Sequence, residues 1–234
     1  MINSSRGIKG FFPKGAACWA LDGTPSGLAD QYGNGNNLTP LATATPYPVI
    51  QSDAGHSGYN FTGIATESLT ASDSVSLRPT EFTVICHVRH GQNTGAGQVY
   101  LSKMRNGTIA FSYILGRQIT TDLIALTIFD SANRSAVGTY KAINGKTDII
   151  IGTYSQINSR VRLFVNGMFI DETATVGNIA YGAFPLRIGN YTSGTFGAHG
   201  IIGASGVLNF EATSSQVADY YRYETETSRK YWIM

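Results

Sequence analysis

The stretch RVRLFVNGMFIDE, residues 160–172, contains the clearest local structural signal in the chain. Apolar and polar residues alternate on both sides of Asn166-Gly167, the dipeptide that most readily adopts the positive φ angles of a two-residue type I′ turn. In a strand, successive side chains point to opposite faces. Before the turn, one face therefore carries Val161, Leu163 and Val165, and the other carries Arg160, Arg162 and Phe164. The stretch therefore predicts a β-hairpin with one buried face.

Segments of similar character lie on both sides of this hairpin and predict an all-β chain. The expected strands are 16–22, 38–42, 58–65, 67–71, 80–90, 98–104, 108–115, 122–130, 136–142, 147–157, 184–192 and 201–210. Two further Asn-Gly turns are expected, at Asn106-Gly107 and Asn144-Gly145. Because Pro46 and Pro48 exclude a central strand nearby, residues 43–58 are expected to form a loop.

One segment near the end of the chain departs from the strand pattern. Thr213 and Gln216 form a capping-box sequence, and apolar residues then recur at helical spacing, which predicts a helix over 213–225. An apolar tail follows, and its last residues are too hydrophobic to leave in water without a partner: Tyr231, Trp232, Ile233 and Met234. Two interpretations stay open, in which the tail packs back on the domain or docks on a neighbouring subunit.

Length and composition fit one domain made of short strands and tight turns. The chain has 234 residues, 27 glycines and only 14% charged residues. We expect an N-terminal arm over 1–15, the domain over 16–226 and a C-terminal tail over 227–234. Of the two cysteines, Cys86 lies in an apolar strand and is expected to be a small buried hydrophobe, while the redox compartment, and with it whether Cys18 and Cys86 are free, stays open.

The charge pattern and hydropathy exclude several classes of partner. The 17 Lys and Arg residues are scattered among 15 Asp and Glu residues, so no basic stripe suited to nucleic acid is expected. No apolar run is long enough for a membrane span. No secretory signal is readable either, because Pro13, Lys14 and Gly15 interrupt the apolar N-terminal segment.

The sequence contains no convincing catalytic constellation. No strand carries the paired carboxylates that glycoside hydrolysis needs. The segment Gly55-His56-Ser57-Gly58 lacks the strand–turn–helix context of a nucleophile elbow. His87 and His90 are three residues apart on one predicted strand, so they point to opposite faces and cannot share a zinc ion. We therefore expect a protein that is not an enzyme and that has no required cofactor.

Two loops contain candidate binding residues. A sugar site needs an aromatic platform and convergent polar groups, which the 190–199 loop offers together with the 91–98 loop; its candidates are Asn190, Tyr191, Phe196 and His199. A Gly-rich loop near the N-terminus contains oxygen ligands suited to calcium: Asp22, Asp30, Asn34 and Asn36. For both loops the alternative is that these are ordinary turn residues.

Several stretches, in this order, resemble the laminin-G-like branch of the concanavalin A-like jelly rolls. They are LDGTPSGLADQYGNGNN, TEFTVICHVRH, TDIIIGTYSQINSRVRLFVNG, PLRIGN and GIIGASGVLNFEATSSQVADYY, which together cover most of residues 16–225. One departure is Ile151-Gly152, where the family often has an aromatic residue. The resemblance implies an antiparallel two-sheet jelly-roll sandwich of about a dozen strands with one short C-terminal helix. Related domains often bind calcium at a sheet edge.

These observations favour a non-catalytic protein that acts by recognition or assembly. The leading hypothesis is a virion component, such as a bacteriophage capsid-decoration or tail-associated protein, which docks on other virion proteins or on copies of itself and presents a glycan-binding surface. The alternative is a free or exported carbohydrate-binding lectin, calcium-dependent or not, that is secreted or held at a cell surface.

Overall fold

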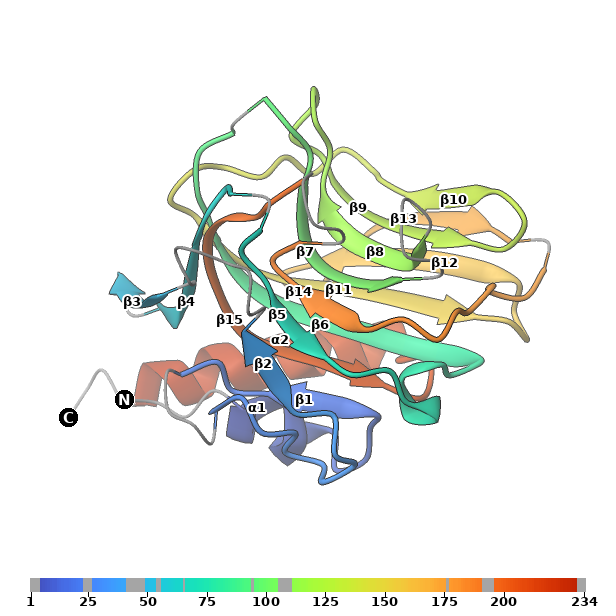
Figure 1. The fold of residues 1–234 in the computed structure, drawn as a ribbon, viewed down its shortest axis with the longest axis horizontal. Coiled ribbons are helices and arrows are strands. Elements are labelled where there is room, and N and C mark those ends of the chain that lie inside the picture. The colour runs from blue at the N-terminus through green and yellow to red at the C-terminus, as the bar shows by residue number, and fades with distance from the viewer. Residues whose placement is uncertain are drawn as a thin grey trace.

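Two antiparallel sheets packed face to face form the body of the protein (Figure 1). The computed structural model describes residues 5–22, 27–40, 49–53, 56–64, 66–93, 95–104, 111–175, 177–190 and 196–230. Strand alternation places one face of each sheet against the other, and these inner faces supply the main hydrophobic core. The predicted antiparallel two-sheet sandwich is confirmed.

The first sheet has eight strands in the order β13-β12-β11-β6-β15-β4-β3, with β1 also pairing with β15. Its strands are β1 (Ala17–Trp19), β3 (Val49–Asp53), β4 (His56–Thr62), β6 (Glu81–His90), β11 (Thr147–Ser155), β12 (Arg160–Val165), β13 (Met168–Ala174) and β15 (His199–Leu208). The second sheet has seven strands in the order β10-β9-β8-β7-β14-β5-β2. Its strands are β2 (Leu38–Pro40), β5 (Leu69–Ala71), β7 (Gln98–Met104), β8 (Phe111–Arg117), β9 (Ile124–Phe129), β10 (Asn133–Ala136) and β14 (Leu186–Ile188).

The Asn166-Gly167 hairpin forms as predicted between β12 and β13. Asn166 has a φ of 52° and Gly167 a φ of 76°, as a type I′ turn requires, and Val165 pairs with Met168 across the turn. The prediction of a single buried face is too narrow, because Phe164 on the opposite face is also buried. A helix covers that face.

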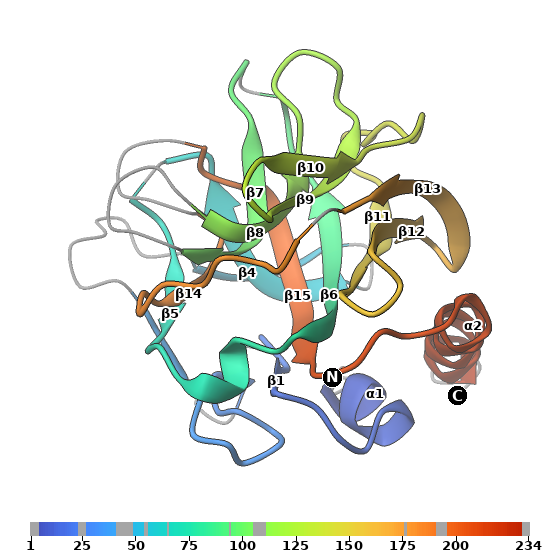
Figure 2. The ribbon, with the colours of Figure 1, turned by 90° about the vertical axis from the view of Figure 1, so that its right-hand side faces the viewer.

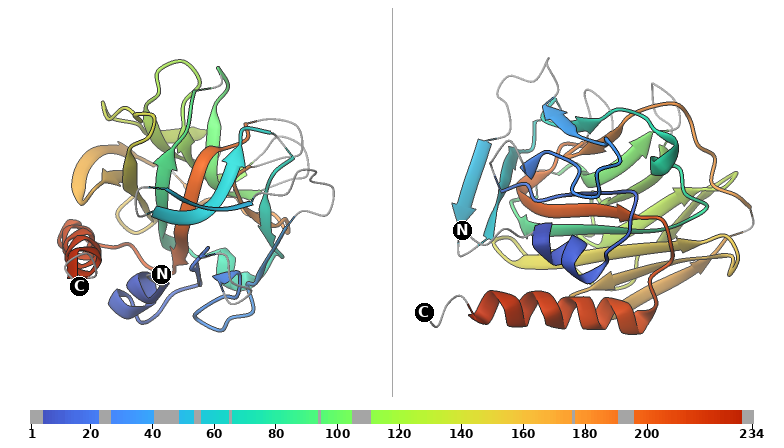
Figure 3. Two further views of the ribbon diagram at one scale, coloured as in Figure 1. Left: turned by 90° about the vertical axis from the view of Figure 1, so that its left-hand side faces the viewer. Right: turned by 90° about the horizontal axis from the view of Figure 1, so that it is seen from below.

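Two helices pack on the outer face of the eight-stranded sheet (Figures 2 and 3). The predicted capping box begins α2 (Ser214–Lys230): the Thr213 amide donates to Gln216 Oε1 and the Gln216 amide to Thr213 Oγ1. The helix extends five residues beyond the predicted end at 225. Its buried face contributes Tyr220, whose hydroxyl lies 2.9 Å from His87 Nε2 on β6.

The N-terminal segment is helical where only an arm was expected. Helix α1 (Ser5–Phe11) lies beside α2 and against β15. Phe11 and Phe12 pack on Tyr220, with ring centroids 5.6 and 5.4 Å away. This aromatic packing stabilises a helix of seven residues, which is too short to form on its own in water.

Two strand assignments need correction. Residues 49–53 and 56–58 are not a loop: they belong to β3 and β4, and β3 pairs with β4 at the edge of its sheet, where a nearby proline is tolerated. Residues 137–142, expected to continue a strand, leave the sheet after Ala136 except for a single bridge between Lys141 and Leu123. A short 3-10 turn, η2 (Val75–Leu77), precedes β6.

The core contains large aromatic side chains and both cysteines are buried. Trp19 is fully buried and its indole Nε1 donates to the Asn36 carbonyl at 2.7 Å, so its one polar atom is satisfied. Cys18 and Cys86 are both free thiols, and burial raises the pKa of each to about 12. The prediction that Cys86 is a small buried hydrophobe is confirmed.

Candidate functional site

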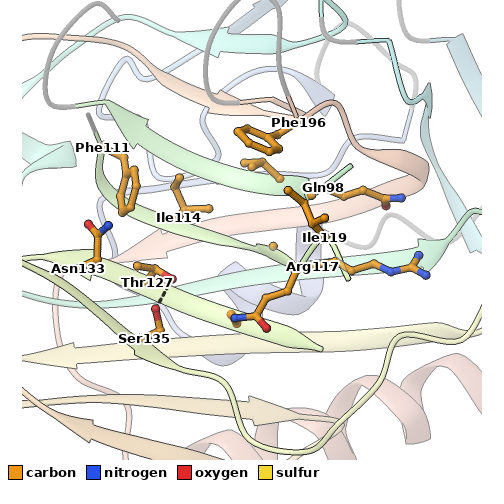
Figure 4. A pocket seen from close by; sticks show the side chains of 14 residues that line it. Gln98, Phe111, Ile114, Arg117, Ile119, Thr127, Asn133, Ser135 and Phe196 are labelled. Atoms are coloured by element: carbon orange, nitrogen blue, oxygen red, sulfur yellow. Dashed lines mark hydrogen bonds between the residues drawn. The ribbon is translucent and has the colours of Figure 1, made fainter. Parts of the chain in front are cut away.

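A hollow of about 360 Å³ lies on the outer face of the seven-stranded sheet, over β7, β8, β9 and β10 (Figure 4). Tyr113 and Leu115 of β8 point into the core, so alternation turns Ile114 and Gly116 toward the hollow. Several of the lining residues are small and leave space above the sheet: Gly97, Gly116, Ala125 and Ser135. A side chain at Gly116 would begin 2.2 Å from the Gln98 carbonyl oxygen, so only glycine fits there.

Two phenylalanines line opposite parts of the hollow (Figure 4). Phe111 stands at the start of β8, whereas Phe196 comes from the loop that leads into β15. Phe196 packs with Val99 and Ile114 in a small apolar cluster separate from the main core. Its carbonyl accepts a hydrogen bond from the Val99 amide at 3.3 Å, which fixes the loop to β7.

Polar groups line the remainder of the hollow. Thr127 and Ser135 lie across from each other on β9 and β10, with their hydroxyl oxygens 2.8 Å apart. Asn133 stands beside them (Figure 4). Arg117 is held in place by Asp122, at 2.9 Å from Nε and 2.7 Å from Nη2, so this charge is already paired. The hollow thus combines two aromatic rings with hydroxyl and amide groups, and the described part of its lining contains no Asp or Glu.

The structure separates the four predicted sugar-binding residues. Phe196 lines the hollow. His199 is not among its described lining residues, and its Nδ1 donates to the Gln92 carbonyl at 3.0 Å. Asn190 is fully buried and its carbonyl accepts a hydrogen bond from Ser102, so it supports the loop and presents no side chain to a ligand. Tyr191 lies outside the described residues.

Sequence reasoning missed Phe111, Ile114 and the polar residues of β9 and β10. A signal was available for Ile114. It is apolar, yet it belongs to the opposite face from the core residues Tyr113 and Leu115. Large apolar side chains on the outer face of a sheet indicate a covered or ligand-binding surface.

The predicted calcium loop is instead organised around the Asp30 carboxylate. Asp30 Oδ1 accepts the Tyr32 amide at 3.0 Å, and Oδ2 accepts the Asn34 amide at 3.0 Å and the Asn36 amide at 3.3 Å. The side chains of Asn34 and Asn36 both donate to the Ala16 carbonyl. Asp22 lies beside Gly27, away from these contacts. Amide donors therefore occupy the oxygens that calcium would need, and calcium binding stays a prediction.

The described part of the chain contains no cluster of three or more His, Cys, Asp or Glu residues suited to a metal ion. His87 and His90 point to opposite faces of β6, as predicted, since His87 contacts Tyr220 of α2 and His90 faces Tyr100. No described helix has the length and hydrophobicity needed to cross a bilayer. The candidate assembly residues Tyr231, Trp232, Ile233 and Met234 lie outside the described range.

A buried polar cluster joins the two sheets beside the Asn-Gly hairpin. Asp148 Oδ2 lies 3.0 Å from His90 Nε2, and Asp148 Oδ1 accepts hydrogen bonds from Tyr140 and Asn166, each at 2.7 Å. His90 Nδ1 lies 3.0 Å from the Tyr100 hydroxyl. Burial alone would raise the pKa of Asp148, but these hydrogen bonds and the adjacent His90 hold it below its usual value. Since both side chains of the His90–Asp148 pair are fully buried, the cluster is structural.

The sheet order, the helix on the outer face and the hollow with its aromatic walls define a lectin-like jelly roll. Residues 61–218 match the family model of the concanavalin A-like lectin/glucanases superfamily, and the chain belongs to that superfamily. A search of curated proteins gave no match.

Solved structures of the same fold include several binding domains. Domain 4 of AbnA, an extracellular arabinanase from Geobacillus stearothermophilus solved with arabinotriose, has a TM-score of 0.68 and 15% identity, covering 89% of this chain and 98% of that one. The botulinum neurotoxin serotype G binding domain has a TM-score of 0.69 and 13% identity over 92% of this chain. The binding domain of paraclostridial mosquitocidal protein 1 has a TM-score of 0.70 and 12% identity over 90% of this chain. The match covers 52% of each toxin domain.

Proposed function

We propose that this chain is a non-catalytic glycan-binding domain whose ligand lies in the hollow on the outer face of the seven-stranded sheet. The observation that carries the proposal is the pairing of Phe111 and Phe196 with the hydroxyls of Thr127 and Ser135 and the amide of Asn133. A sugar ring offers an apolar face and a rim of hydroxyls, which these groups complement.

The composition of the hollow supports binding without catalysis. Among the residues that the structure describes, none that lines it is acidic, whereas glycoside hydrolysis needs two carboxyl groups on either side of the scissile bond. The rigid setting of Arg117 and Gln98 also favours a binding surface, because both side chains are fixed by protein contacts before any ligand arrives.

Phe196→Ala and Phe111→Ala should each weaken glycan binding at least about tenfold, because each removes an aromatic face equivalent to ~1.4 kcal/mol or more of binding free energy. A glycan array that includes arabinotriose would first identify the ligand, and calorimetry would then measure the dissociation constants. Phe169→Ala is the matched control, since Phe169 is an exposed phenylalanine on β13 of the other sheet. A silent array, or equal loss in all three variants, would count against this site.

A second candidate function, assembly into a larger particle such as a virion, is favoured by the exposed edges of the eight-stranded sheet. Val49 and Ile50 on β3 are 58% and 51% exposed, and Met168 and Phe169 on β13 are 57% and 54% exposed. Edge strands with exposed apolar residues are typical places for another chain to pair. We propose that these edges are where copies of the chain, or other particle subunits, would dock.

Ile50→Lys and Phe169→Lys should abolish any self-association, because each places a charge on an edge that would become buried. Sedimentation velocity over a range of protein concentrations would measure it. Ile157→Lys, in the exposed turn after β11, is the control at 83% exposure and should sediment as the wild type does. A wild-type chain that stays monomeric at high concentration would contradict docking between copies.

A further inference from the structure

The two phenylalanines of the hollow mark its opposite ends along β8 (Figure 4). Phe111 is the first residue of β8, whereas Phe196 packs against Val99, whose register partner is Gly116 further along the same strand. The stretch of strand from Phe111 to Gly116 spans roughly 15 Å. A sugar ring is no larger than a phenyl ring, so a single sugar residue cannot stack on both phenylalanines at once.

Between the two phenylalanines, the lining consists of small and hydroxyl-bearing residues. The strand register places Ile114 opposite Thr127, and Thr127 opposite Ser135, so one row across the sheet carries both hydroxyls. In the next row Gly116 lies opposite Ala125, and neither residue projects far from the sheet. The two hydroxyls share one hydrogen bond of 2.8 Å, which leaves one hydroxyl proton and several lone pairs for a ligand.

The charge of the hollow is already compensated by the protein. Among the described residues that line it, Arg117 alone is charged. Its Nε and Nη2 lie 2.9 and 2.7 Å from Asp122 Oδ1, and its Nη1 donates to the Gly91 carbonyl at 3.1 Å. An acidic sugar would have to compete with Asp122 for this guanidinium. The described lining is therefore suited to an uncharged ligand.

We infer that the hollow binds a linear, neutral oligosaccharide of at least three residues, whose chain runs along β8 with its outer residues stacked on Phe111 and Phe196. A residue between them is hydrogen-bonded by Thr127 and Ser135. The inference rests on the proposed glycan-binding function and names the size and charge of the ligand. A chain that reaches both rings gains affinity because its second stacking contact forms within a complex that the first contact already holds together.

The first test varies only the length and the charge of the ligand. Calorimetry would measure dissociation constants of the wild type for chains of one to five residues of arabinose, xylose, glucose or galactose. For at least one of these series, affinity should rise roughly tenfold or more from the dimer to the trimer and change little beyond it. A trimer of galacturonic acid should bind more weakly than the same trimer with its carboxyls reduced to alcohols.

Variants then assign the contacts to particular residues. Phe111→Ala and Phe196→Ala should each lower the affinity for the trimer to about that for the dimer, because one stacking contact remains. Thr127→Val keeps the shape of the side chain without its hydroxyl, so it should weaken the trimer roughly three- to tenfold and affect the monosaccharide little. Phe169→Ala, on β13 of the other sheet, is the control and should match the wild type at every length. Thermal melting would verify that each variant is folded.

Four outcomes would overturn the inference while the glycan-binding proposal stands. They are full affinity already for a monosaccharide or a dimer, equal losses at every chain length in the two phenylalanine variants, tighter binding of the galacturonic acid trimer than of its reduced form, and binding of none of the neutral series although the glycan array detects another ligand. No binding of any series together with a silent glycan array would overturn both proposals.

Discussion

Replacing Asp148 with alanine should lower the free energy of unfolding by roughly 3–5 kcal/mol, because the carboxylate satisfies several buried groups at once. His90, Tyr140 and Asn166 all direct a hydrogen-bonding atom at it, and each would lose its partner. Asn166 also anchors the hairpin turn, since its Oδ1 accepts the Ile149 amide at 2.9 Å. The substitution therefore loosens β11 and the turn together.

Urea unfolding of the wild type and of Asp148→Ala would measure this loss, with Asp219→Ala as control. Asp219 pairs with Arg222 on the exposed face of α2, where an ion pair contributes only ~0.5 kcal/mol. The folded-state pKa of Asp148 is lowered, so its contribution is present above the ordinary Asp pKa and is lost as pH falls through the lower folded value. The difference between wild type and Asp148→Ala should accordingly shrink in acid. A cost equal to that of the control would contradict the assigned role.

Gly167→Val should destabilise the protein by about 2–5 kcal/mol, from two separable causes. The φ of 76° is unfavourable for a side chain and most unfavourable for a β-branched one, which costs about 1–2 kcal/mol or more. A Cβ at this position would also lie 2.9 Å from Tyr221 Cβ on α2, and overpacking of this kind costs roughly 1–3 kcal/mol.

Gly145→Val separates the two causes. Gly145 follows Asn144 in the same kind of dipeptide and has a φ of 77°, but its nearest neighbour, Arg89 Nη2, would be 3.9 Å from the added Cβ. This variant should show the backbone cost alone, so the difference between the two losses in urea unfolding measures the contact of the hairpin with α2. Equal losses would mean that α2 moves aside without cost.

Much of the sandwich could be predicted from local sequence because the strand period of two is itself local. The faces of β6 illustrate this: Phe82 and Val84 enter the main core, as predicted, while Ile85 enters the separate cluster under the helices. The capping box of α2 was readable for the same reason. In contrast, α1 has two glycines among its seven residues, and it owes its stability to packing against Tyr220.

The candidate site was less predictable because its shape depends on strand register. Phe196 could be predicted as a sugar-binding candidate because it is an aromatic residue in the 190–199 loop. Phe111 could not be placed beside the hollow, since β7 and β8 shift register between Val99 and Leu101 and again between Lys103 and Met104. Such shifts depend on tertiary packing.

The place of β15 in the eight-stranded sheet has a consequence for how the chain folds. This strand pairs with β6 on one side and with β4 and β1 on the other. It follows all three of these partners in the sequence. Until residues 199–208 have left the ribosome, β13-β12-β11-β6 and β4-β3 have no shared neighbour. The two halves of the sheet therefore join late during synthesis, through contacts of very large sequence separation, and a slow closing step is the natural outcome of this topology.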